Sequence, residues 1–467
     1  MRRTAVINVV GLTPRLLGEH TPRLSAFAQA AARAAIEPAF PAVTCPAQTA
    51  YLTGRPPAQH GIVGNGWYDR ALAEVHFWKQ SNHLVQAPRL WHRLRAGHPD
   101  FTCAKLFWWF NMYADVEWSV TPRPMYPADG RKVFDIYAWP YALRPALKRD
   151  LGEFPFPAFW GPAAGVDSPA GPPDAASRWI AAAARWIERH HRPTLNLVYL
   201  PHLDYNLQRL GPDHPAIAAD LRRIDELAGG LVAFFQERDV RVVVLSEYGL
   251  VPVRRPVHLN RVLRRAGWLV VKEELGREQL DAGSSGAFAV ADHQVAHLYL
   301  KRPDLADAVR ETVTALPGVA RVLDAEEKRA RGLDHPRAGD LIAVAEPDAW
   351  FTYYYWEDDA RAPDFARTVD IHRKPGYDPV ELFARPDWSP LRLKAHIARR
   401  LLQKRLGFRM LMDVIPLDAT LVRGSHGAPP AASDDWPLLL TDTPDALPAA
   451  RLPATEVFEV LRRTVAG

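Results

Sequence analysis

Three short, continuous runs of apolar, largely β-branched residues constrain the fold of this chain more than any other feature. They are AVINVV (5–10), LNLVYL (195–200) and VRVVVLS (240–246). Runs of this kind are typical of parallel strands that are buried on both faces. The segments between them carry apolar residues at three-to-four spacing, which predicts helices over 21–35, 175–191 and 214–239. Strands that alternate with helices predict an α/β fold with a doubly wound, mostly parallel sheet.

The pattern changes between residues 285 and 345. Here AFAVADHQVAHLYLKR precedes an Asp-rich helical segment and further short apolar runs. We expect a small α+β insertion over 285–345, set into an α/β core made of 1–284 and 346–467. The length of 467 residues fits one elaborated α/β domain of this kind.

Charge and composition exclude several classes of protein. Lys and Arg (58) nearly balance Asp and Glu (53), so the total charge indicates no nucleic-acid partner. No stretch approaches the roughly 18 apolar residues of a membrane-spanning helix. The two cysteines exclude a disulfide framework, and we expect a cytoplasmic protein. The basic stretch 391–409 predicts a solvated helix, and peripheral contact with an anionic membrane surface is the alternative.

Polar residues follow the strand-like runs, at the sheet edge where ligands bind in doubly wound folds. Asp204 comes shortly after LNLVYL, Gln208 lies one helical turn further on, and Glu247 and Tyr248 follow VRVVVLS. An acidic residue after a strand often caps the next helix instead. Two carboxylates at one edge exceed what capping requires, so we expect a functional cluster here.

Thr44 lies in FPAVTCPAQTAYLTG (40–54), where Pro46 suits a first helical turn and Gly54 suits a helix end. We expect Thr44 to be the N-cap of a helix over 45–53, among backbone N–H groups that favour an anion. The alternative is that Thr44 only caps this helix.

Two further residues lie in glycine-rich segments. Asn65, in HGIVGNGWYDR, could donate to a developing oxyanion, although an Asn between glycines is commonly a turn residue. His426, in RGSHG, is flanked by glycines that allow a tight backbone.

The order of these motifs resembles the nucleotide pyrophosphatase/phosphodiesterase branch of the alkaline phosphatase superfamily. The resemblance runs from FPxVTxPxxTxxLTG through HGIVGNxxYD to GSHG. It implies that Thr44 is the nucleophile of a hydrolase and that Asn65 holds a phosphate oxygen. It also implies two zinc ions, one bound by Asp204 and His426 and the other by Thr44 and Glu247.

The chain departs from the family's metal ligands at several positions. Val10 stands where the family has an acidic residue, Gln208 where it has His, and Glu247 and Tyr248 where it has Asp and His. We therefore expect one or two divalent ions, with zinc as the expected metal, and these changes argue against a complete two-metal site.

Two other residues are candidates for substitute metal ligands. Asn8 lies two residues before Val10 on the same strand face, and His202 lies two before Asp204. A structural role is the alternative for each of them.

Two functions follow from these patterns. The first is a metal-dependent phosphodiesterase or pyrophosphatase that uses Thr44 on a small-molecule phosphoester. The second is a non-hydrolytic homologue that acts as a binding or scaffold protein in a biosynthetic pathway. The aromatic segments 106–113 and 350–356 are either core or the lining of a pocket for an apolar substrate group.

Overall fold

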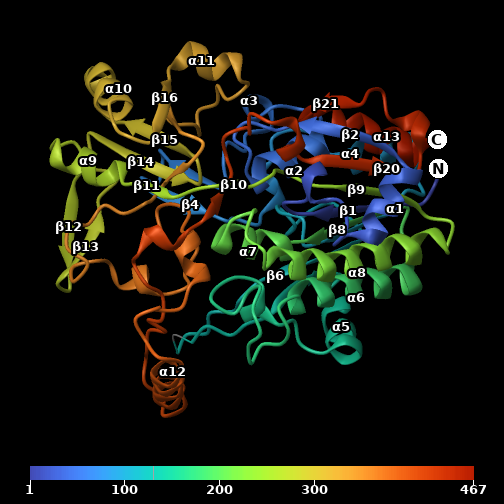
Figure 1. Ribbon diagram of the computed structural model, residues 1–467, viewed down its shortest axis with the longest axis horizontal. Helices are drawn as coiled ribbons and strands as arrows, with labels where there is room; N and C mark the ends of the chain where they lie inside the picture. Colours follow the sequence, from blue (N-terminus) through green and yellow to red (C-terminus); the bar gives the residue numbers. More distant parts are fainter. Residues whose placement is uncertain (130) are drawn as a thin grey trace.

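A large mixed sheet forms the core of the protein, seen in a computed structural model that describes residues 1–129 and 131–467 (Figure 1). Within this part of the chain, the sheet has nine strands in the order β21-β2-β20-β9-β1-β8-β5-β6-β7. The strands are β1 (Thr4–Val9), β2 (Ala32–Glu37), β5 (Cys103–Leu106), β6 (Trp118–Pro122), β7 (Ile136–Trp139), β8 (Leu195–Leu200), β9 (Arg241–Leu245), β20 (Leu438–Thr441) and β21 (Arg451–Pro453). The run β9-β1-β8-β5-β6 is parallel throughout, which confirms the predicted α/β class.

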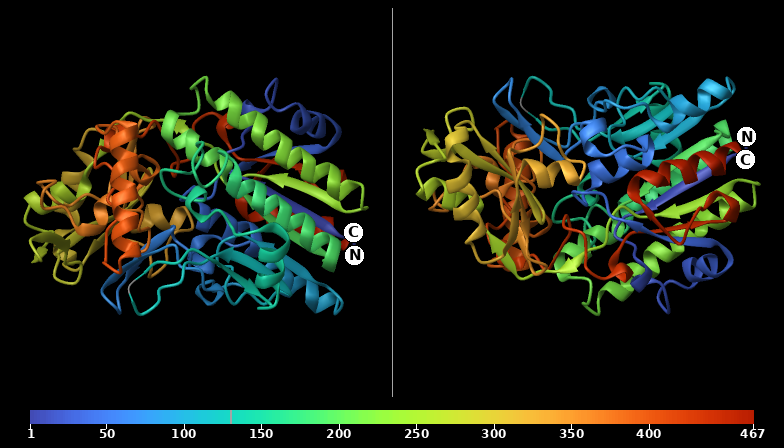
Figure 2. Two further views of the ribbon diagram at one scale, coloured as in Figure 1. Left: turned by 90° about the horizontal axis from the view of Figure 1, so that it is seen from below. Right: turned by 90° about the horizontal axis from the view of Figure 1, so that it is seen from above.

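Helices cover both faces of this sheet (Figures 1 and 2). One face carries α1 (Pro22–Ala30), α5 (Leu143–Leu151), α6 (Ala175–His191) and α8 (Ile217–Gln236). The other face carries α2 (Thr44–Thr53), α4 (Leu90–Gly97) and α13 (Val457–Ala466). The helix predicted over 21–35 is wrong at its end, because residues 32–35 pair with β20 as part of β2. Five of the six residues of β2 are Ala, Arg or Glu and only Ile36 is β-branched, so its sequence carries no strand pattern that could separate it from a helix.

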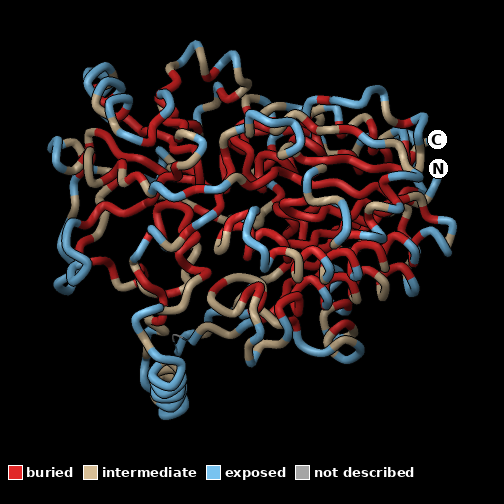
Figure 3. Tube along the Cα trace, viewed as in Figure 1, coloured by how far each residue is buried: buried red, intermediate tan, exposed pale blue. Residues whose placement is uncertain are grey.

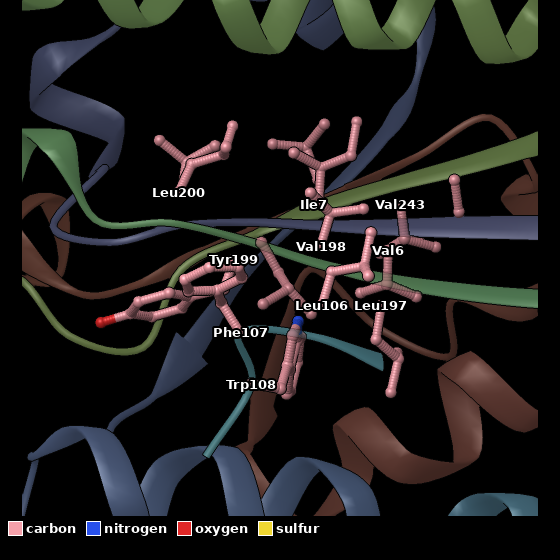
Figure 4. Close-up of a cluster of buried hydrophobic side chains, with 14 of the residues drawn as sticks. Val6, Ile7, Leu106, Phe107, Trp108, Leu197, Val198, Tyr199, Leu200 and Val243 are labelled. Atoms are coloured by element: carbon pink, nitrogen blue, oxygen red, sulfur yellow. The ribbon is translucent and has the colours of Figure 1, made fainter. Parts of the chain in front are cut away.

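Apolar side chains from the central strands fill the space between sheet and helices. Val6, Ile7, Val198 and Val243 are fully buried, and Figure 4 shows them with Trp108 in one cluster. Fully burying such a side chain contributes about 1.5–3 kcal/mol. This packing makes the carboxyl edge of the central strands a rigid platform for the loops that follow.

A second lobe is built on an antiparallel sheet in the order β14-β15-β17-β16. Its elements are β14 (Ala287–Asp292), β15 (Val295–Leu300), α10 (Ala306–Thr314), β16 (Val319–Leu323), α11 (Ala325–Ala330) and β17 (Leu341–Ala345). Apolar side chains of this sheet form one hydrophobic cluster with side chains of α9 (Leu259–Arg265) and of the buried aromatic run 350–356. The division of the chain at 285 and 345 remains a proposal.

Shorter elements and one exposed helix complete the described fold. They are β3 (Gly66–Asp69), β4 (Glu74–Phe77), α3 (Pro57–His60), α7 (His202–Leu210), β10 (Val251–Pro252), β11 (Arg255–Val257), β12 (Val271–Glu274), β13 (Arg277–Leu280), β18 (Ala349–Phe351), α12 (Pro390–Arg405) and β19 (Gly424–Ser425). Helix α12 extends away from the packed body, and none of its residues is buried (Figure 3). Across the described residues, none of the helices is both long and apolar enough to cross a bilayer.

Candidate functional site

The register of the central strands brings the predicted site residues to one edge of the sheet. Asn8 of β1 is the register partner of Tyr199 in β8 and of Leu245 in β9. Strand β8 leads into α7, which carries Asp204, and Glu247 follows shortly after the end of β9. The carboxyl groups predicted from separate parts of the sequence therefore meet at the expected edge.

Thr44 is the first residue of α2, and the prediction that it is the N-cap is wrong. Val43 holds the cap position, and it makes no side-chain capping bond. The Thr44 hydroxyl lies 3.3 Å from the hydroxyl of Tyr248 and lines a cavity instead. The positive end of the helix dipole is still next to it, so the hydroxyl sits where negative charge is favoured.

Asn65 is fixed beside the start of α2. Its Oδ1 accepts a hydrogen bond from the Cys45 backbone N–H at 3.0 Å, and its Nδ2 and backbone N–H donate to Asp292 at 3.0 and 2.7 Å. The following residue must be glycine, because a Cβ on Gly66 would lie 2.3 Å from the Phe77 ring. The structure thus brings Asn65 next to Thr44 and holds its amide in one orientation.

Glu247 is fully buried next to Thr44. Its Oε1 accepts hydrogen bonds from the amides of Asn8 and Gln48, while its Oε2 has no hydrogen-bond partner among the described residues. Burial raises the pKa of Glu247 to about 8, although the Gln48, Asn8 and Thr44 side chains act in the opposite direction. At neutral pH the protonated form of this carboxyl therefore predominates, and the two forms are equally populated near pH 8.

Asp204 lines the same cavity as Thr44. It accepts hydrogen bonds from Gln208 at 2.7 Å and from the Tyr248 hydroxyl at 3.2 Å, and Gln208 in turn accepts one from Tyr377 at 2.9 Å. Burial raises the pKa of Asp204 to about 7. Either hydroxyl can be the donor in the contact between Thr44 and Tyr248.

His426 belongs to a column of stacked rings beside this network. Its ring centroid lies 3.5 Å from that of Tyr248 and 3.7 Å from that of His293, and His293 lies 3.7 Å from Tyr377. Nδ1 of His426 donates to the Ala42 carbonyl at 2.7 Å, which leaves Nε2 as the lone-pair nitrogen. Burial lowers the pKa of His426 to about 3, so the ring is neutral.

His202 contacts helix α8. Its Nε2 lies 3.0 Å from an oxygen of Asp220 on α8. This contact favours the structural alternative for His202, and its role as a substitute metal ligand stays a prediction. Asn8, the other candidate, reaches the site through its bond to Glu247.

The network opens onto a cavity of about 100 Å³ with a largely aromatic lining. Its aromatic residues include Trp78, Trp109, Phe156, Phe159, Trp160, Tyr199, Tyr205, Tyr248 and Tyr377. Of the described residues that line it, Lys132 alone carries a formal positive charge with the histidines neutral. The cavity thus suits a ligand with a large apolar group and little negative charge.

Comparisons with known proteins agree with this geometry. The family model for type I phosphodiesterases/nucleotide pyrophosphatases matches residues 4–378. The chain belongs to this family. An uncharacterized pyrophosphatase/phosphodiesterase of Schizosaccharomyces pombe is 24% identical over 224 residues, which cover 46% of this chain and 37% of that protein. The matched region is thus well under half of that phosphodiesterase.

Solved structures show the same fold. Murine ectonucleotide pyrophosphatase/phosphodiesterase 5 in complex with AMP superposes with a TM-score of 0.58 at 15% identity, covering 100% of this chain and 95% of the other. Phosphonoacetate hydrolase from Sinorhizobium meliloti, in complex with phosphonoformate, gives a TM-score of 0.61 at 16% identity, covering 100% and 96%. At these identities the likeness concerns the fold alone.

The donors present here do not fit the zinc ions implied for this phosphodiesterase family. A catalytic zinc ion usually has three protein ligands. No group of three or more His, Cys, Asp or Glu side chains in the described parts of the chain is placed to hold a metal. The Tyr248 hydroxyl lies between Asp204 and Thr44, and amide donors occupy oxygens of Asp204 and Glu247. Four buried atoms of the network have no hydrogen-bond partner among the described residues, namely Glu247 Oε2, His426 Nε2, Asn8 Oδ1 and His293 Nδ1, but they do not form a set of three His, Cys, Asp or Glu ligands around one point.

The sequence did not reveal several residues of this phosphodiesterase-family site. Gln48 lies one helical turn after Thr44, and this spacing is the signal that could have shown it. Asp292 and His293 lie at the tip of the β14–β15 hairpin in the second lobe, and no local pattern links them to Asn65. They reach the site only through the packing of the two lobes.

Proposed function

We propose that this family member hydrolyses an ester of the phosphodiester class, with Thr44 as the nucleophile. The observation that supports the proposal most is the position of Thr44, which is the first residue of α2 and lies next to the buried Glu247. The Thr44 hydroxyl is near enough to lower the pKa of Glu247, and Oε2 of Glu247 has no partner within the described chain.

The side chains supply the proton transfers that such a reaction needs. Thr44 Oγ1 bonds to phosphorus as its proton passes to Oε2 of the ionised form of Glu247, and the bond from phosphorus to the leaving oxygen breaks. Asp204 lines the cavity and has a pKa of about 7, so its protonated form donates to the leaving oxygen. Water then displaces Thr44 from phosphorus, with the same groups returning the protons. No step passes through a metal ion.

The cavity limits the charge of the substrate. Asp204 and Glu247 are acidic, and Lys132 is the cation among the described lining residues. A phosphomonoester dianion meets more repulsion here than a diester monoanion does. The aromatic lining offers stacking surface for the group that leaves. We infer a diester with at least one large apolar or aromatic substituent.

A non-hydrolytic binding protein is the second candidate, and one observation favours it. The Tyr248 hydroxyl bridges Thr44 and Asp204, so the nucleophile and the acid are already paired with a neutral group. In such a protein, the aromatic cavity holds a ligand without transforming it.

Turnover of bis(p-nitrophenyl) phosphate, measured after dialysis against a chelator, separates the two candidates. We expect release of p-nitrophenol by the wild type, a loss of at least about a thousandfold in Thr44→Ala, and partial activity in Thr44→Ser. Turnover by Thr44→Ala at the wild-type rate would remove Thr44 from the mechanism. Quenching of tryptophan fluorescence by the same diester without turnover would establish the binding protein instead.

A further inference from the structure

Helix α12 (Pro390–Arg405) has no buried residue, although it is a well-formed helix of 16 residues. The Ser389 side chain caps its start by accepting from the Arg392 backbone N–H, and Pro390 occupies its first turn. Figures 1 and 3 show it standing out from the second lobe as an exposed rod. Most helices in proteins are stabilised by packing of an apolar face, and α12 buries very little apolar surface within this chain.

One face of α12 is attached to the body of the protein. Leu393 and Ile397 pack against the hydrophobic cluster of the second lobe. Arg400 donates to Asp413 at 2.9 and 3.0 Å, and His396 lies 2.8 Å from the same carboxylate. These contacts fix the rotation of the helix, and therefore which residues point outward.

The opposite face carries an apolar stripe. Leu391, Ala395, Ala398 and Leu402 follow one another at spacings of four, three and four residues, which places them on one side of a helix. Leu391 is 78% exposed and Leu402 is 56% exposed. Leu406 and Phe408 extend the stripe beyond the helix end with exposures of 65% and 66%. Single exposed leucines are ordinary, but a continuous stripe directed away from the body is not.

Cations flank this stripe on both sides. Helix α12 contains six Lys or Arg residues and no acidic residue. At 100° per residue, Lys394 and Arg405 lie on one side of the stripe and Arg399 lies on the other. Within the described chain, Arg400 has its ion pair with Asp413, and no carboxylate is within ion-pair distance of those three flanking cations. Their charge is therefore available to a partner.

We propose that α12 docks this protein on the surface of an anionic lipid bilayer. An apolar stripe with a cationic border is the arrangement by which a helix lies in the plane of a membrane interface. The uncompensated positive charge selects negatively charged lipids. This inference is independent of the reaction proposed for Thr44.

Flotation of the full chain with vesicles tests the proposal. The two vesicle types are phosphatidylcholine alone and phosphatidylcholine mixed with phosphatidylserine. We expect wild-type protein to float only with the mixed vesicles, and less at high salt. The variant Lys394→Gln/Arg399→Gln/Arg405→Gln should bind roughly a hundredfold more weakly, at about fivefold per cation.

The apolar stripe is tested with Leu391→Glu/Leu402→Glu, and Leu72→Glu serves as the control because it replaces another exposed leucine, on the β3–β4 turn. We expect the double variant to stay with the unbound protein and the control to float like the wild type. Thermal unfolding at an unchanged temperature shows that the fold persists. Failure of the wild type to float with mixed vesicles, equal flotation with phosphatidylcholine alone, or flotation of the double variant would each overturn the proposal.

Discussion

Replacement of the buried Lys105 tests how burial controls charge next to the site. Its Nζ donates to the carbonyls of Trp109 and Phe110 at 2.7 and 2.8 Å, and so shapes the loop that brings Trp109 to the cavity. Burial lowers the pKa of Lys105 from 10.5 to about 7. The folded protein therefore favours the neutral amine, whereas the unfolded chain keeps the ordinary lysine pKa.

The sign of the pH effect follows from these two pKa values. Between about pH 7 and 10.5 the unfolded chain binds a proton at Lys105 that the folded chain does not bind. The free energy of unfolding thus rises with pH by ~1.4 kcal/mol per unit from this group, or ~2.7 kcal/mol over two units. Lys105→Met removes this dependence. It also leaves the two carbonyls unpaired, at a cost of about 1–3 kcal/mol for each that is nearly independent of pH.

Urea unfolding of wild type and Lys105→Met at about pH 7.5 and about pH 9.5 measures the difference. We expect the advantage of the wild type in unfolding free energy to be ~2.7 kcal/mol larger at the higher pH. Lys79→Met, at an exposed lysine, should show no such change. An advantage that stays constant between the two pH values would show that Lys105 is charged inside the fold, and would refute the reasoning.

Two further predictions concern the site. Dialysis against a chelator should leave the rate and the unfolding temperature unchanged, because the described residues offer no set of three metal ligands; activity lost on chelation and restored by zinc would contradict this. Tyr248→Phe removes the hydroxyl that donates to Asp204 and should lower the free energy of unfolding by about 1–3 kcal/mol in urea titrations. A Phe variant as stable as the wild type would show that Asp204 does not depend on that bond.

Hydrophobic periodicity predicted the architecture where strands are apolar and helices amphipathic. The run LNLVYL became β8 with unchanged bounds, and the helix predicted over 175–191 became α6. Periodicity failed at β2, where an Ala-rich segment carries no strand signal. Its pairing with β20, from the far end of the chain, decides its conformation there.

The site was predictable where motif order and strand ends carried information. Asp204 and Glu247 follow from position in the chain, because the ends of neighbouring parallel strands must meet, and Thr44 follows from the helix-start pattern around it. The partners of these residues were not predictable, since hydrogen bonds such as that from Gln48 to Glu247 span 199 residues of sequence. Zinc was expected from the resemblance to the family, which carries no information on the hydrogen bonds that occupy the oxygens of Asp204 and Glu247.

The residues that replace the family's metal ligands depend on one another. Two carboxyl groups buried at one sheet edge repel each other and lose hydration unless cations or hydrogen-bond donors stabilise them. In this chain neutral donors do so, with Asn8 and Gln48 on Glu247 and Gln208 and Tyr248 on Asp204. The departures from the family's zinc ligands are thus coupled, and the site they form has its own hydrogen-bonding pattern.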